Sequence, residues 1–107
     1  MADTRCMEKR SPHHRLDQIQ AAFAHPATLN RTFSSRQGAD ELGMTDDDVV
    51  AAIQGLRRSD FDKSMTSNAS SKVWQDVYKP IVNGRRLYVK FTTDAQQEWL
   101  LISFKEA

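Results

Sequence analysis

Basic and aromatic side chains alternate along the predicted strands in the second half of the chain. Tyr88 and Lys90 are two residues apart and therefore share one face of an extended strand, and Lys105 belongs to the polar face of the last predicted strand. The strand before them carries two aromatic rings and an amide, on Trp74, Tyr78 and Gln75. Unpaired RNA is bound by such a mixture, with cations for phosphates, aromatic rings for bases and polar groups for base edges. From the pattern alone, a solvated sheet face decorated with lysines is the more common alternative.

The histidines and the single cysteine are the other residues that could do chemistry. His13 and His14 suggest a metal site or a histidine-based ribonuclease, but adjacent residues on a helix point in different directions and arginines lie close by. His25 precedes a proline at a predicted helix end, where a histidine is a common partner of the helix dipole. Cys6 lies in a polar tail without a fixed base beside it. We expect structural or exposed histidines, no catalytic thiol, and neither a metal nor another cofactor.

Length and composition limit the class of protein. A chain of 107 residues fits one domain, and 39% hydrophobic with 27% charged residues is ordinary for a globular protein. A membrane helix needs about 20 consecutive apolar residues, and the longest apolar run here is far shorter. No apolar run follows the basic N-terminus as in a secretory signal, and one cysteine forms no internal disulfide. We therefore expect a cytoplasmic protein.

The formal net charge of +1 conceals an uneven distribution. Residues 16–56 carry two basic and six acidic side chains, whereas residues 57–107 carry nine basic and six acidic ones. A basic second half suits an anionic ligand even though the whole chain is nearly neutral, and a solvated basic surface has the same composition.

Helical periodicity dominates the first half. We predict a helix over residues 13–24, a short strand over 28–33, a helix from a Ser34–Ser35 cap to near Gly43, and a third helix after Thr45. The acidic run Asp46 to Asp48 lies in the first turn of the third helix, where it complements the positive end of the helix dipole. The apolar stripe of that helix consists of Val49, Val50, Ile53 and Leu56.

Period-two alternation dominates the second half. We predict strands over residues 61–66, 74–82, 86–92 and 99–105, and a polar loop over 68–72. Asn83–Gly84 predicts a tight hairpin, and Pro80 marks an edge or a bulge. On the last strand, one face is expected to carry Leu100, Ile102 and Phe104, and the other Leu101, Ser103 and Lys105. The result is an α+β protein, with a flexible extension over residues 1–10 and one domain over residues 11–107.

Several blocks of sequence resemble the MqsR family of toxins, in the same order over nearly all of residues 7–106. The blocks are Met7-Glu-Lys-Arg-Ser-Pro-His, Gly55-Leu-Arg-Arg-Ser-Asp-Phe-Asp-Lys-Ser-Met-Thr66, Trp74-Gln-Asp-Val-Tyr-Lys-Pro80 and Ser103-Phe-Lys-Glu106, with the helical segment Ala39-Asp-Glu-Leu-Gly43 between them. The resemblance implies a RelE-like fold, which is a small antiparallel sheet packed against two to three helices. It also implies an mRNA-cleaving toxin (an mRNA interferase) of a bacterial toxin–antitoxin pair.

The resemblance further implies a substrate, a partner and a site. The family cleaves single-stranded RNA with a preference for GC dinucleotides, and its antitoxin, MqsA, is a zinc-containing DNA-binding protein that would link the toxin to operator DNA. The active-site residues of the family fall on Lys63, Gln75, Tyr88 and Lys105. We expect additional RNA contacts from Lys90, Arg85, Arg86, Trp74 and Tyr78. In metal-independent cleavage the 2′-hydroxyl attacks the adjacent phosphate, lysines stabilise the developing charge, and a lysine or the tyrosine moves a proton.

The sequence departs from the family at a few points and leaves alternatives open. Asp62 stands beside Lys63, where it would either weaken phosphate attraction or hold the lysine in place. Residues 1–6 have no counterpart, and the turn over residues 92–98 is longer than the family pattern. A non-catalytic RNA- or ribosome-binding module is the main alternative function, and a transcriptional regulator is the third. The assignment of acid and base among Lys63, Tyr88 and Lys105 does not follow from the sequence.

Overall fold

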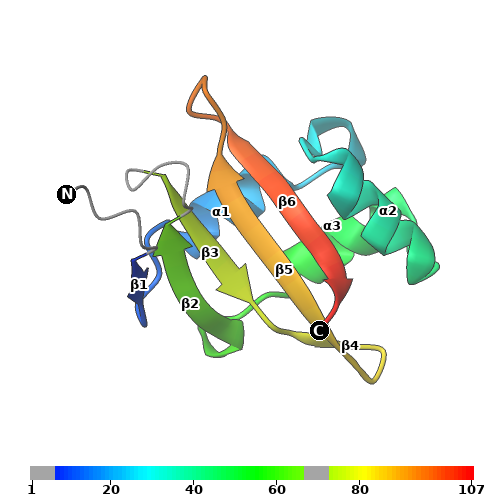
Figure 1. The fold of residues 1–107 in the computed structure, drawn as a ribbon. Coiled ribbons are helices and arrows are strands. Elements are labelled where there is room, and N and C mark those ends of the chain that lie inside the picture. Colours follow the sequence, from blue (N-terminus) through cyan, green and yellow to red (C-terminus); the bar gives the residue numbers. More distant parts are fainter. Residues whose placement is uncertain (1–6, 67–72) are drawn as a thin grey trace.

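The computed structural model describes residues 7–66 and 73–107, which form an antiparallel sheet with three α-helices on one side of it (Figure 1). The strands are β1 (Glu8–Lys9), β2 (Phe61–Thr66), β3 (Trp74–Tyr78), β4 (Ile81–Val82), β5 (Arg85–Thr93) and β6 (Trp99–Glu106). The helices are α1 (Leu16–Ala22), α2 (Phe33–Glu41) and α3 (Asp46–Gln54), with short 3₁₀ turns η1 (Pro26–Thr28) and η2 (Arg58–Asp60). Strands β1, β2, β3 and β5 are neighbours in that order, and β5 also pairs with β4 and β6. The expected α+β class is confirmed.

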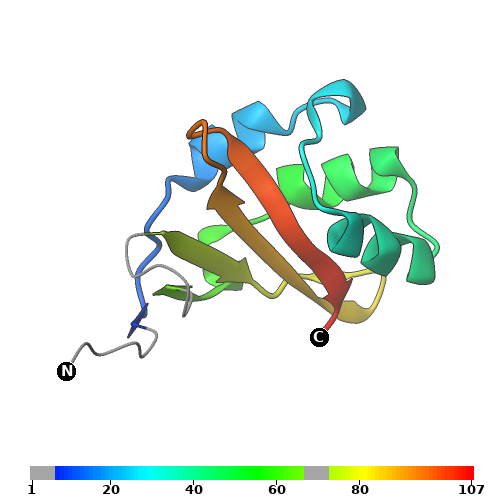
Figure 2. The same cartoon turned by 45° about the horizontal axis from the view of Figure 1, so that its top comes forward.

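The hydrophobic core lies between the sheet and the helices. The side chains in this core include Ile19 of α1, Phe23 directly after α1, Val49 and Ile53 of α3, and Tyr78, Leu87, Val89, Phe91, Leu101 and Phe104 of the sheet. In Figure 1 the sheet faces the viewer with α1 and α3 behind it, and α2 runs beside β6; the rotated view in Figure 2 shows the helices gathered on one side. The opposite face of the sheet is therefore left without a covering helix.

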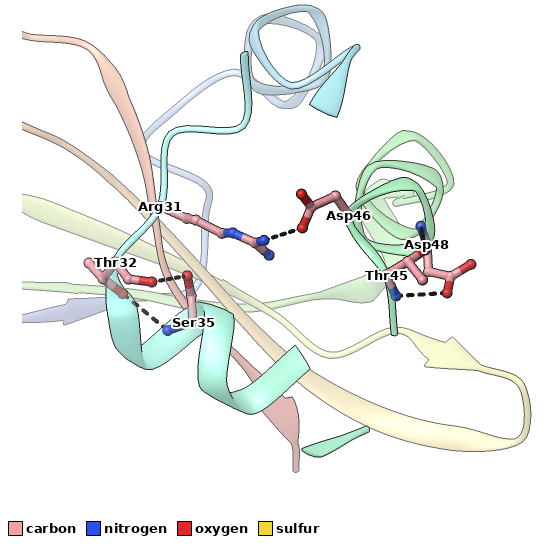
Figure 3. Close-up of polar contacts among 6 residues, drawn as sticks. All are labelled: Arg31, Thr32, Ser35, Thr45, Asp46 and Asp48. Atoms are coloured by element: carbon pink, nitrogen blue, oxygen red, sulfur yellow. Dashed lines mark hydrogen bonds and ion pairs between the residues drawn. The ribbon is translucent and has the colours of Figure 1, made fainter. Parts of the chain in front are cut away.

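Helix α3 begins as its sequence predicts. The Thr45 hydroxyl accepts a hydrogen bond from the Asp48 amide at 3.2 Å, and the Asp48 carboxylate accepts one from the Thr45 amide at 2.9 Å (Figure 3). This reciprocal capping box satisfies two backbone donors that the first turn leaves free. Asp46, in the same turn, pairs with Arg31. The aspartate run thus serves the helix N-terminus, and the expected stripe of this helix is buried.

The other boundaries in the first half differ from expectation. Helix α1 begins at Leu16 rather than at residue 13, and α2 is capped by Thr32, whose hydroxyl accepts from the Ser35 amide at 3.2 Å (Figure 3), rather than by Ser34–Ser35. The predicted strand over 28–33 is wrong, because Pro26 starts a 3₁₀ turn and only Arg31 makes a single bridge, to β6. Isolated apolar residues in a short segment do not distinguish a strand from a turn that packs on a sheet.

The second half follows the predicted strands with one interruption. Strand β2 matches its predicted bounds, but the segment over 74–82 is divided into β3 and β4, since Pro80 donates no ladder hydrogen bond. Asn83 and Gly84 both have positive φ angles, 52° and 80°, and form the predicted hairpin turn.

Strand β6 contains a bulge that reverses its expected pattern. Lys90 and Phe91 of β5 pair with Ser103 and Leu101, so Ile102 is an extra residue on β6. Both Leu101 and Phe104 are consequently buried in the core, at 0% and 1% exposure, although strict alternation had placed them on opposite faces. The bulge brings Leu101 to the core side, whereas the expected opposition of Phe104, in the core, and Lys105, on the uncovered face, is unchanged.

The N-terminal segment contributes to the sheet. Glu8 and Lys9, which the sequence analysis assigned to an extension, pair with Met65 and Ser64 of β2. The division of the chain at residue 10 stays a prediction. Cys6 and the loop predicted over 68–72 lie outside the described residues.

Candidate nucleic-acid interface and active site

The strand register places two lysines in one row on the uncovered face of the sheet. Lys63 on β2 lies opposite Val77 on β3, Val77 lies opposite Lys90 on β5, and Lys90 lies opposite Ser103 on β6. Residues paired in this way point to the same side of a sheet. The residues before and after Lys90 on its strand belong to the core beneath the helices, so this row points away from the helices.

The remaining positions inferred from the resemblance share this face. Tyr88 is two residues from Lys90 on β5 and pairs with Lys105 on β6. Gln75 is two residues from Val77 on β3 and pairs with Met65. The structure therefore brings Lys63, Gln75, Tyr88 and Lys105 to one face from four different strands. Their roles in catalysis stay a prediction.

Three lysine ammonium groups lie close to the ring of Tyr88. The Nζ atoms of Lys105, Lys90 and Lys79 lie 5.4, 5.7 and 6.0 Å from the ring centroid. Burial raises the pKa of the Tyr88 hydroxyl above its usual range; the Lys63 ammonium opposes this shift, and the Asp62 carboxylate reinforces it. A raised pKa keeps the phenol protonated at neutral pH, so it can donate a hydrogen bond to an anionic group.

Lys90 occupies the middle of this face. It is half-buried on β5, between β3 and β6. Burial lowers its pKa below the usual range of a lysine, and the ammonium groups of Lys105 and Lys63 lower it further. Near neutral pH a larger fraction of Lys90 is therefore in the neutral amine form than for an isolated lysine.

Two carboxylates hold two of the lysines. Glu8 Oε1 of β1 lies 3.3 Å from Lys63 Nζ, and Asp62 Oδ2 lies 3.5 Å from Lys79 Nζ. Asp62 therefore does not pair with its sequence neighbour, and the carboxylate that contacts Lys63 comes from a distant strand. Sequence reasoning missed Glu8 and Lys79. Glu8 occurs in the first block that resembles the MqsR family, but only the pairing of β1 with β2 shows where it lies.

The residues expected to make additional RNA contacts do not all reach this face. Arg86 is two residues from Tyr88 on β5 and therefore points to the same side of the sheet. Its guanidinium donates a hydrogen bond to the Lys79 carbonyl at 2.8 Å. Arg85, the residue next to Arg86, points to the opposite side of the sheet. Trp74 is four residues from Tyr78 on β3 and therefore points to the core side of the sheet. Its ring stacks on the His13 ring, with 5.2 Å between the ring centroids and 16° between the ring planes. Arg85 and Trp74 are therefore not part of the uncovered face.

Tyr78 lies in the core and not on the uncovered face. It is fully buried, and its ring packs edge-on against Phe61 and Phe91 in the core. Burial, with a smaller contribution from the Asp76 carboxylate, raises the pKa of Tyr78 to about 12. A ring with no exposed surface cannot stack on a base, so Tyr78 is a core residue rather than an RNA contact.

The histidine pair belongs to a segment that we call the N-terminal strap, residues 7–14. The amides of His13 and His14 donate to the Asp76 carboxylate at 3.3 and 2.9 Å, and the Met7 amide donates to the Thr66 hydroxyl at 2.8 Å. Ser64 also donates to Asp76. Asp76, Ser64 and Thr66 are fully buried polar residues on β2 and β3. Their hydrogen bonds hold the strap against these strands, which places Glu8 beside Lys63.

Two kinds of feature are absent from the described residues. Within residues 7–66 and 73–107, no three His, Cys, Asp or Glu side chains lie close enough together to hold a metal ion. None of the helices in this part of the chain is long and apolar enough to cross a membrane.

The fold and the uncovered face define a class of protein. It is a small α+β protein that presents lysines, a protonated phenol and an amide on one side of its sheet, and this combination suits a polyanion with polar bases. Residues 11–106 match the family described as motility quorum-sensing regulator, toxin of MqsA. The chain is also 41% identical, over 100 residues, to the mRNA interferase toxin MqsR of Escherichia coli (strain K12). The aligned residues cover 94% of this chain and 99% of that relative. The chain belongs to the MqsR toxin family.

Proposed function

We propose that this protein is an endoribonuclease toxin that cleaves single-stranded mRNA and thereby stops translation and growth. The observation that carries the proposal is the convergence of Lys63, Gln75, Tyr88 and Lys105 from four strands on one face of the sheet. A relative that matches nearly the whole chain is named an mRNA interferase, which supports the same activity.

The reaction that suits these groups is transesterification within the RNA. The 2′-oxygen forms a bond to the adjacent phosphorus while the bond from phosphorus to the 5′-oxygen breaks. The proton of the 2′-hydroxyl passes to a base, and the leaving 5′-oxygen takes a proton from an acid. The products are a 2′,3′-cyclic phosphate and a 5′-hydroxyl.

Each side chain of the site has a task in this reaction. The ammonium of Lys63, held by Glu8, and the hydroxyl of Tyr88 stabilise the charge that develops on the phosphate oxygens. Gln75 orients a phosphate or a base edge, and Lys105 contributes a further cation beside Tyr88. Arg86 extends the cationic face along β5 and binds a neighbouring phosphate.

The proposal includes a partner and a preferred sequence. The family description names the toxin of MqsA, so an MqsA-like antitoxin is proposed to hold this chain inactive. The finer parts of the same proposal are a zinc site in that antitoxin, its binding to operator DNA, cleavage near GC dinucleotides, and action in the cytoplasm, where mRNA is translated.

Three substitutions test the proposed site. Lys63→Ala, Tyr88→Phe and Lys105→Ala should each fold normally and lose most cleavage of a single-stranded RNA in the presence of EDTA. Arg36→Ala, which removes an exposed cation from α2, serves as the control and should retain cleavage. Full activity in all three site variants would reject the site. Cleavage by the unaltered protein only with a divalent metal would reject the mechanism, and RNA binding without cut ends would favour the non-catalytic module.

A further inference from the structure

Lys90 occupies the point where the charged groups of the uncovered face converge. On β5 its nearest neighbour on the same face is Tyr88, and its Nζ lies 5.7 Å from the Tyr88 ring centroid. Its two partners across the sheet are uncharged, Val77 on β3 and Ser103 on β6. Lys63 flanks it in the same row beyond Val77. The position is thus central and half-buried, and its immediate cross-strand contacts are neutral.

The carboxylates of this face are distributed unevenly among the lysines. Lys63 is paired with Glu8, and Lys79 is paired with Asp62. Among the residues that the structure describes, neither Lys90 nor Lys105 has a carboxylate within ion-pair distance. A lysine near other cations and without a carboxylate loses its proton more readily than a paired lysine. Lys90 is the more buried of the two, and burial disfavours the charged form further.

We propose that Lys90 is a catalytic residue of this site, and that its neutral amine is the base that accepts the proton of the 2′-hydroxyl. This inference rests on the proposed ribonuclease function. The bond from the 2′-oxygen to phosphorus forms as that proton moves to Lys90 Nζ. The bond from phosphorus to the 5′-oxygen breaks, and the 5′-oxygen takes a proton from the ammonium of Lys105, whose Nζ lies 5.4 Å from the centroid of the same Tyr88 ring. Both lysines then return to their starting forms by exchanging one proton each with water.

The sharpest test separates the charge of Lys90 from its ability to give up a proton. Lys90→Arg keeps a cation at this place, but a guanidinium is not deprotonated in proteins. General base catalysis contributes about 100-fold or more to a rate. We therefore expect kcat of Lys90→Arg to fall about 100-fold while KM changes less than about threefold. Lys9→Arg, the same exchange on the far side of the sheet, is the matched control and should stay within about twofold of the unaltered protein.

The pH profile provides a readout that a merely structural role would not move. In the unaltered protein kcat/KM, whose pH dependence reports the free protein, should rise with pH as Lys90 loses its proton, with a midpoint below the usual pKa of a lysine because burial, Lys105 and Lys63 lower it. This limb of the profile should be absent in Lys90→Arg. Retention of kcat and of the same limb in Lys90→Arg would overturn the proposal and leave Lys90 as a charge that binds RNA.

A second variant covers the case in which arginine does not fit between β3 and β6. Lys90→Cys in a Cys6→Ser background should be inactive, and aminoethylation of the new thiol, which restores a primary amine at this place, should restore kcat. Failure of rescue in a folded, fully modified protein would contradict the assignment. Absence of cleavage by the unaltered protein would instead refute the proposed function, so the two failures are distinguishable.

Discussion

The buried carboxylate of Asp76 offers a direct test of how the N-terminal strap is held. Asp76 is fully buried and accepts hydrogen bonds from two strap amides and from the Ser64 hydroxyl. In Asp76→Ala the His14 amide and the Ser64 hydroxyl lose their acceptor, and the His13 amide keeps only its hydrogen bond to Ser64 Oγ, at 3.1 Å. A hydrogen bond to a charged group contributes about 1.5–3 kcal/mol, but the Ser64 hydroxyl can turn to another acceptor and relief of carboxylate desolvation offsets part of the loss. We expect the free energy of unfolding to fall by about 3 kcal/mol.

The assay is thermal unfolding followed by circular dichroism, together with amide hydrogen exchange. For a domain of this size about 3 kcal/mol corresponds to a decrease in Tm of about 15 °C. The Thr66 amide, which donates to the Met7 carbonyl at 2.9 Å, should exchange faster as the strap detaches. Asp40→Ala, which removes an exposed carboxylate from α2, is the control and should shift Tm by no more than about 2 °C.

Asp76→Asn refines the test, because the amide keeps one oxygen acceptor but presents its NH₂ group to the remaining donors. Its Tm should lie between those of the unaltered protein and of Asp76→Ala. If Asp76→Ala left both Tm and the exchange of the Thr66 amide unchanged, the strap would not depend on Asp76 and the reasoning would be refuted.

Two further predictions follow from single contacts. Gly38 faces the Phe104 backbone of β6, and a Cβ atom there would overlap the Phe104 carbonyl oxygen. Gly38→Ala should therefore lower the free energy of unfolding, measured by urea denaturation, by about 2 kcal/mol or more. Unchanged stability would contradict this packing. Glu8→Gln removes the carboxylate that holds Lys63. Because a partly exposed ion pair contributes up to about 1 kcal/mol, kcat for RNA cleavage should fall up to about fivefold, whereas KM should not rise since an anion leaves the RNA-binding face. Glu98→Gln, at an exposed turn, is the control, and a higher KM with unchanged kcat would refute the positioning role of Glu8.

Local signals account for the parts of the fold that the sequence predicts correctly. The capping box of α3 depends on residues three apart, and the Asn83–Gly84 turn depends on two adjacent residues with positive φ. Strand β2 follows from its period-two pattern. In each case the interaction that defines the element lies within the segment itself, so a single sequence contains it.

Long-range pairing accounts for the parts that the sequence does not predict. The bulge at Ile102 exists only in the register between β5 and β6, and it decides that Leu101 and Phe104 share the core. Residues 28–33 carry a strand-like pattern, yet their partner is a single bridge from Arg31 to β6. Such features depend on how separate segments meet, which periodicity does not encode.

The same distinction applies to the candidate site. The resemblance named Lys63, Gln75, Tyr88 and Lys105, and alternation along β5 correctly placed Tyr88 with Lys90. The pairing of Lys63 with Glu8 required knowledge that β1 joins the sheet. The expectation that Tyr78 binds RNA is wrong, because aromatic composition does not reveal which face of a strand is buried.

The chemistry of the RNA ends tests the central claim most directly. Purified protein would be incubated with a defined single-stranded RNA in the presence of EDTA, and both ends created at each cut would be identified by mass spectrometry. We predict a 2′,3′-cyclic phosphate on one fragment and a 5′-hydroxyl on the other. Intact RNA, or fragments that carry a 3′-hydroxyl and a 5′-phosphate, would contradict the assignment of this protein as a ribonuclease that acts through the 2′-hydroxyl.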